Sequence, residues 1–181
     1  AAAGIALASP ALAGQVIPVG PFNSVEASDG AHVTIRHGGA QQVTMVKGST
    51  EFSRFEVRDG VLHLITCEGW HCPRHYSFEV DVVMPAINAI EASDGADIET
   101  QGSFPAQGNL VVKATDGGDI DARAIVAANV DAKASDGGNL KIHPRKSMQA
   151  HAEDGGNIDY WGNPTVTRLV AEDGGNVHGE D

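Results

Sequence analysis

Aromatic residues, basic residues and long apolar runs are all scarce in this chain of 181 residues. Phe, Trp and Tyr make up only 5% of it, so Ala, Val, Ile and Leu must fill the core, which favours a narrow β architecture over a helical bundle. The 24 acidic and 12 basic residues give a net charge of −12, which would repel a phosphate backbone. We therefore expect no nucleic-acid partner. No internal segment approaches the ~20 apolar residues of a membrane span, so we expect no membrane-spanning segment.

Cysteine is also scarce, and both residues, Cys67 and Cys72, lie in one short segment. In an exported chain two such cysteines most simply form a disulfide. Free thiols are one alternative. A Zn²⁺ or copper site is another, with these thiolates joined by His71 and His75, although the spacing is not that of a zinc finger. Trp70, His71 and His75 are candidate ligand contacts, with a packed lid residue as the alternative for Trp70.

The N-terminal segment is small and apolar and ends in Pro10-Ala11-Leu12-Ala13, which is similar to a signal-peptidase site. We expect residues 1–13 to be the end of a signal peptide, with an ordered first strand as the alternative. The protein would then be secreted, periplasmic or otherwise located in the cell envelope.

A repeated corner is the main internal signal. Six segments share Ala-x-Asp-Gly-Gly/Ala, then a polar residue and an Ile, Leu or Val: 27–33, 92–98, 114–120, 134–140, 152–158 and 171–177. The last five aspartates are separated by 22, 20, 18 and 19 residues, which matches one coil of a solenoid.

Each corner position has a physical explanation. Asp-Gly supplies a turn in which the Gly takes a positive φ, and the flanking apolar residues alternate as in strands with one buried face. Successive coils would pair as parallel strands, with a right-handed crossover. We therefore predict an all-β fold, a parallel β-helix or β-solenoid, with its regular coils over residues 87–181.

The first half, residues 14–86, is less regular. Residues 55–64 alternate on both sides of Asp59-Gly60, a preferred β-hairpin turn, and a strand over 76–84 stops at Pro85. We expect one domain, 14–181, in which residues 14–86 cap the regular coils.

Several short segments resemble the GIN-domain family, described as putative auto-transporter adhesin heads. They are Phe22-Asn23-Ser24-Val25, the hairpin 57–62, the strand 80–85, and the corners followed by Asp119-Ile120 or Asn139-Leu140. The resemblance spans about residues 16–181 and implies a bacterial extracytoplasmic β-helix-like fold without known catalytic residues. Asp-Gly-Gly stands here where the family usually has Ser-Gly-Ser-Gly, so an acidic edge need not be general to the family.

Stacked corners would bring carboxylates of neighbouring coils close together. Water and salt can screen exposed charges, and the turn alone already demands Asp and Gly. The alternative is Ca²⁺ held between coils by oxygen ligands. The candidate ligands are Asp116, Asp136, Asp154, Asp173, Asn139 and Asn157. We expect no other cofactor.

Signs of an enzyme are few. Asp97, Asp119 and Asp121 should point outward from strands without a matching Arg or Lys cluster, and the chain has neither a Gly-x-Ser-x-Gly elbow nor a Walker loop. We expect a non-enzymatic surface or envelope module that binds a glycan, a protein or another copy of itself. A polysaccharide lyase or hydrolase is the alternative.

Overall fold

The computed structural model describes residues 14–67 and 71–180, so the expected signal-peptide segment 1–13 lies outside the described residues. All regular elements of the described part are β-strands in one 15-stranded sheet. Within this part no helix is long and apolar enough to cross a membrane. The strands are β1 (Gln15–Ile17), β2 (Ser24–Ser28), β3 (His32–His37), β4 (Gln42–Lys47), β5 (Arg54–Arg58), β6 (Val61–Ile65), β7 (Glu79–Met84), β8 (Ala89–Ala92), β9 (Asp97–Gln101), β10 (Gln107–Ala114), β11 (Asp119–Ala134), β12 (Asn139–Ala152), β13 (Asn157–Trp161), β14 (Thr165–Ala171) and β15 (Asn176–Glu180).

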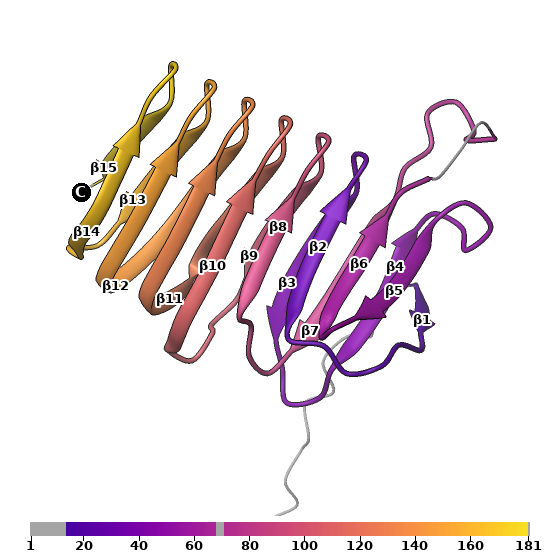
Figure 1. Ribbon diagram of the computed structural model, residues 1–181. Coiled ribbons are helices and arrows are strands. Elements are labelled where there is room, and N and C mark those ends of the chain that lie inside the picture. Colours follow the sequence, from indigo (N-terminus) through magenta and orange to yellow (C-terminus); the bar gives the residue numbers. More distant parts are fainter. Residues whose placement is uncertain (1–13, 68–70, 181) are drawn as a thin grey trace, which may run out of the picture.

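Two columns of parallel strands make up most of the sheet, and corners connect them layer by layer (Figure 1). The strands that enter the corners pair in the order β6, β2, β8, β10, β11, β12, β14. The strands that leave them pair in the order β7, β3, β9, β11, β12, β13, β15. The long strands β11 and β12 contribute to both columns. The parallel register predicted from the corners is confirmed, since Ala114 pairs with Ala134 and Asn139 with Asn157.

The core lies between the two columns and is filled by alternate strand residues. On the entering strands the buried positions two residues before the corner Ala are Val25, Ile90, Val112, Ala132 and Ala150. On the leaving strands the buried positions are Val33, Val80, Ile98, Ile120, Leu140 and Ile158. Each buried Val, Leu or Ile contributes about 1.5–3 kcal/mol relative to an exposed one, so these rows hold the layers together.

Layers at one end are not stacked in chain order. β2 and β3 lie between the layer of β6 and β7 and the layer of β8 and β9. After β3 the chain therefore forms the terminal layer, which contains β6 and β7. It then continues at β8 on the opposite side of the layer of β2 and β3. As a result the corners at Asp29 and Asp94 are neighbours, and the Gly30 N–H donates to the Asp94 carbonyl oxygen at 3.0 Å.

Antiparallel strands are confined to this same end. The hairpin predicted at Asp59-Gly60 is confirmed, because β5 and β6 pair antiparallel on either side of it. β4 pairs antiparallel with β7, and β1 with β4. At the opposite end β14 and β15 have a parallel partner on one side only, and Leu169 is 51% exposed.

Candidate functional site

The corners are turns in which both central residues have a positive φ. Asp116 has φ 50° and Gly117 φ 72°, and the Gly118 N–H donates to the Thr115 carbonyl oxygen at 2.8 Å, as in a type I′ turn. A positive φ was expected from the sequence at the Gly, and the structure has one at the Asp as well. Asp is among the few residues that tolerate the left-handed region, which explains its place in every corner.

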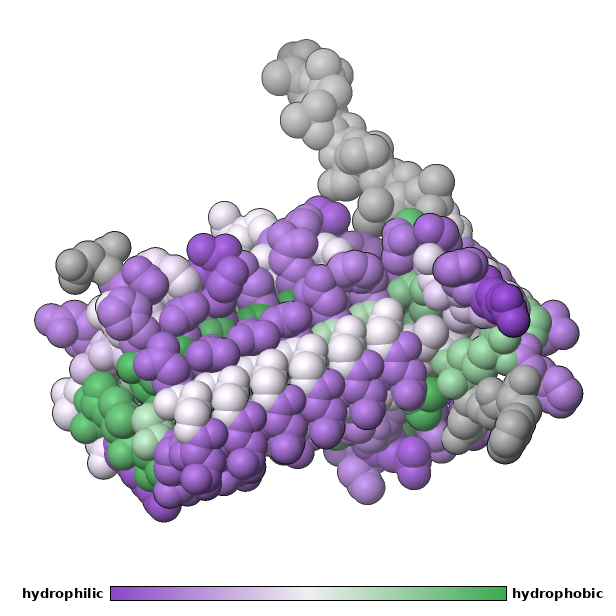
Figure 2. Space-filling view, turned by 90° about the horizontal axis from the view of Figure 1, so that it is seen from above, coloured by the Kyte–Doolittle hydropathy of each residue, from purple (hydrophilic) through white to green (hydrophobic). Residues whose placement is uncertain are grey.

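The second Gly of the corner allows neighbouring layers to approach closely. A Cβ on Gly138 would lie 2.3 Å from the carbonyl oxygen of Ala114 in the adjacent layer. The corners at Asp29 and Asp94 have an Ala instead of this second Gly. The methyl groups of Ala31 and Ala96 are both buried. Figure 2 looks down on the corners and shows a straight pale row flanked by hydrophilic rows.

The six proposed Ca²⁺ ligands fall into two rows. Asp116, Asp136, Asp154 and Asp173 lie one per layer at the exposed tips of the corners. Asn139 and Asn157 lie beside them in a hydrogen-bonded row, where Asn139 Nδ2 donates to Asp119 Oδ1 at 2.7 Å and Asn157 Nδ2 to Asn139 Oδ1 at 3.0 Å. The Asn139 oxygen is thus engaged by its neighbour rather than directed to the aspartates.

Carboxylates gather on the outer face of β9 and β11. Asp97 pairs in register with Asp119, and Glu99 with Asp121. Burial is the main cause that raises the pKa of Asp97, and the charges of Asp119, Glu99 and Asp121 add to it, while His32 at 3.3 Å opposes it. A shallow hollow with Asn139 in its lining lies over these carboxylates.

Basic groups stand beside these carboxylates, contrary to the expectation from sequence. Burial by itself would raise the pKa of Asp121, but hydrogen bonds from Arg123, with Nε at 2.8 Å from Oδ1, bring it below the ordinary value. The Arg123 guanidinium also lies 4.9 Å from the ring centroid of Trp161. Lys141 pairs in register with Asp121. The pKa values of Asp97 and Asp121 are therefore shifted in opposite directions on one open face.

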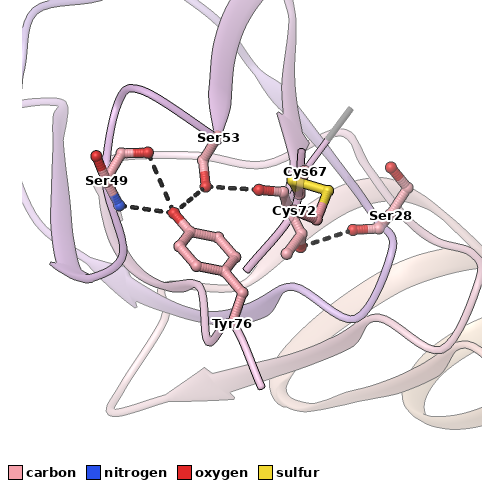
Figure 3. Close-up of a disulfide and its surroundings, with 7 residues drawn as sticks. Ser28, Ser49, Ser53, Cys67, Cys72 and Tyr76 are labelled. Atoms are coloured by element: carbon pink, nitrogen blue, oxygen red, sulfur yellow. Dashed lines mark hydrogen bonds between the residues drawn. A yellow bond between two sulfur atoms is a disulfide. The ribbon is translucent and has the colours of Figure 1, made fainter. Parts of the chain in front are cut away.

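A disulfide joins Cys67 and Cys72, as predicted (Figure 3). Their loop connects β6 to β7 and so takes the place of an Asp-Gly corner in the terminal layer. His71 and His75 are exposed on the loop, and Trp70 lies outside the described residues. With both sulfurs in the disulfide, the two thiolates of the alternative metal site are not available.

Tyr76 fixes this loop to its surroundings. The Ser49 N–H donates to the Tyr76 hydroxyl oxygen at 2.6 Å, and the Ser53 hydroxyl lies 2.7 Å from it (Figure 3). Ser53 also donates to the Thr66 carbonyl oxygen at 2.6 Å, and Thr66 donates to the Ser28 carbonyl oxygen at 3.2 Å. The loop is therefore tied to the neighbouring corner.

A hydrogen-bonded row of two amides and one hydroxyl, which we call the amide row, crosses the outer face of β10, β11 and β12 and consists of Asn109, Asn129 and Ser147. Asn129 Nδ2 donates to Asn109 Oδ1 at 2.8 Å, and Ser147 Oγ donates to Asn129 Oδ1 at 2.7 Å. Sequence reasoning missed this row. Aligning the repeats could have found it, because each member stands five residues before the Ala of its corner.

A shallow hollow lies over the amide row. Its lining includes Val111, which is 48% exposed, together with Asp131, Gln149 and Thr167. Amide, hydroxyl and carboxylate groups beside an exposed apolar side chain on an open face can bind a hydroxyl-rich ligand.

Comparison with family models identifies the family. The family model described as "Putative auto-transporter adhesin, head GIN domain" matches residues 21–108 and 106–164. None of the curated proteins matches the chain. The crystal structure of a putative adhesin from Bacteroides fragilis has 16% identity and a TM-score of 0.58, covering 94% of this chain and 97% of that one. A putative adhesin from Parabacteroides distasonis has 15% identity and a TM-score of 0.48, covering 92% and 95%.

At these identities the similarity to solved structures concerns the fold alone. The two matches to the family model together span most of the chain. The protein therefore belongs to the GIN-domain family.

Proposed function

We propose that the protein is a non-enzymatic surface or envelope module that binds a neutral glycan along the amide row. The observation that carries this proposal is the hydrogen-bonded succession of Asn109, Asn129 and Ser147 across three layers of an open face. Each side chain offers both a donor and an acceptor, so a polymer with repeated hydroxyl groups can make the same contact layer after layer. The exposed Val111 supplies an apolar contact for the face of a sugar ring.

Charge favours a neutral ligand over an acidic one. The chain carries a net charge of −12, and long-range repulsion would slow the approach of a polyanion. The adhesin description of the family supports a binding role at the cell surface.

The architecture suits such a role if the stack is a right-handed parallel β-solenoid, as we propose from the corner spacing and the parallel register. In this proposal residues 14–181 form one domain, in which residues 14–86 cap the regular layers. The segment 1–13 directs export. The regular layers 87–181 then provide the extended faces.

A panel of immobilised polysaccharides tests the binding proposal. We expect saturable retention of the protein on one or more neutral polysaccharides, weaker retention on acidic ones, and no release of reducing ends. Retention only on acidic polysaccharides, or on no member of the panel, would contradict the proposal.

The carboxylates of β9 and β11 that pair in register beside Arg123, with pKa values shifted in opposite directions at Asp97 and Asp121, favour a hydrolase or lyase as the second candidate. Release of reducing ends or unsaturated products that stops in Asp97→Asn would establish that candidate instead.

A further inference from the structure

The last two corners of the stack differ from the others at their second position. The four earlier corners carry a hydroxyl residue there, Ser28, Ser93, Thr115 or Ser135, and the last two carry Glu153 and Glu172. These glutamates are in adjacent layers, because the Glu153 N–H donates to the Ala134 carbonyl oxygen and the Glu172 N–H to that of Ala152. The turn does not require a carboxylate at this position, since a hydroxyl residue serves in four of the six corners.

An imidazole lies between the two carboxylates. His151 lies near the end of β12, and Glu153 directly follows the last residue of that strand, so the two side chains are two residues apart in extended chain. His151 Nε2 is 3.2 Å from Glu153 Oε2 and 3.6 Å from Glu172 Oε1. One ligand atom from each residue lies within 4.8 Å of the other two.

His151 Nε2 is shielded from solvent and lacks a hydrogen-bond partner among the described residues. The Glu153 oxygen at 3.2 Å is within ion-pair distance of it. A neutral imidazole presents a lone pair at this nitrogen, so a cation placed between it and the two carboxylates would contact all three groups.

The local charge favours a cation. Lys133 Nζ is 2.7 Å from Glu153 Oε1, which leaves Oε2 facing the imidazole. The negative charges of Asp136 and Asp154 also act on Lys133. Carboxylates therefore outnumber the ammonium group here.

We infer that His151, Glu153 and Glu172 bind one divalent transition-metal ion of the Zn²⁺ class. Nitrogen and carboxylate ligands suit zinc, whereas Ca²⁺ takes six to eight oxygens. Ligand atoms about 2.0–2.1 Å from a tetrahedral zinc lie about 3.3 Å apart. The separations of 3.2 and 3.6 Å from His151 Nε2 are close to this value. Solvent would complete the coordination.

Titration calorimetry with ZnCl₂ on the tag-free full chain tests the inference. We expect one ion per chain and a loss of affinity of roughly tenfold or more in Glu172→Ser and in His151→Gln. Glu172→Ser restores the residue type of the earlier corners, so it should fold. The matched control is His63→Gln, which removes an imidazole 3.1 Å from Glu26 that has no third ligand among the described residues and should leave the affinity unchanged.

Cobalt provides a second measurement. Co²⁺ should give a visible absorption band that ZnCl₂ abolishes and CaCl₂ does not. If the wild-type chain binds no zinc, or if Glu172→Ser and His151→Gln bind it as tightly as the wild type does, the inference is wrong.

Discussion

At the residue scale, the corner is explained by two different demands on its backbone. Asp116 and Gly117 supply the two left-handed conformations of the turn. Gly118, with an ordinary φ, lets the layer approach the carbonyl oxygen of Ala92. Replacing the first Gly of a corner with Ala therefore tests the left-handed backbone conformation, and replacing the second Gly tests the close approach of the layers.

Gly138→Ala should destabilise the fold more than Gly137→Ala. The new Cβ at position 138 would lie 2.3 Å from a backbone oxygen that cannot move alone, so we expect a loss of about 2–3 kcal/mol. At position 137 there is space but φ is +75°, which predicts a loss of about 1 kcal/mol. Urea unfolding measures both. Equal stabilities, or the reverse order, would contradict this account of the corner.

The raised pKa of Asp97 predicts a pH-dependent stability. In the folded state this carboxyl keeps its proton at a pH where the unfolded chain has lost it, so its contribution to stability falls as pH rises from the ordinary Asp value through the raised one. Asp97→Asn should therefore gain stability over the wild type at pH 7 and little or none at pH 3. Unfolding curves at both pH values measure this. A gain that is larger at pH 3 would show that the sign is wrong.

At the element scale, the all-β content, the hairpin at Asp59-Gly60 and the parallel register of the corners could be predicted from the sequence, because each depends on local turn chemistry and alternation. The position of β2 and β3 between β6–β7 and β8–β9 could not, because it depends on long-range pairing. The amide row was missed because its members are recognised only when the repeats are aligned on their corners. The contact of Arg123 with Asp121 could not be predicted because it depends on side-chain geometry.

Removing the disulfide should weaken the terminal layer. The loop it closes is short, so Cys67→Ala/Cys72→Ala should lose about 2 kcal/mol. Protease cleavage should increase first within residues 66–78, because the disulfide no longer restrains the loop between its hydrogen-bonded residues Thr66 and Tyr76. Cleavage that begins instead in the regular layers would contradict this role.

At the scale of the whole molecule, the two ends of the stack differ. Antiparallel strands cover one end, whereas β14 and β15 leave Leu169 and Val166 51% and 38% exposed at the other. Apolar surface is visible at the left end of the stack in Figure 2, where Figure 1 places β14 and β15. An exposed edge strand with apolar neighbours favours association with another chain.

We therefore predict self-association through this end. Sedimentation velocity should show a concentration-dependent shift that Leu169→Asp abolishes. Val46→Asp, which changes a 40% exposed Val on β4, is the matched control and should leave the shift intact. A wild-type chain that stays monomeric at every concentration would contradict the prediction.

The most direct test of the proposed function compares two amides on opposite columns. Asn129→Ala interrupts the amide row, and Asn139→Ala interrupts the equally hydrogen-bonded row on the leaving strands. Binding to the neutral polysaccharide retained in the panel would be measured by biolayer interferometry for both variants and the wild type. The account predicts that affinity falls by roughly tenfold or more in Asn129→Ala and stays unchanged in Asn139→Ala. Equal affinities for all three, or a loss only in Asn139→Ala, would contradict it.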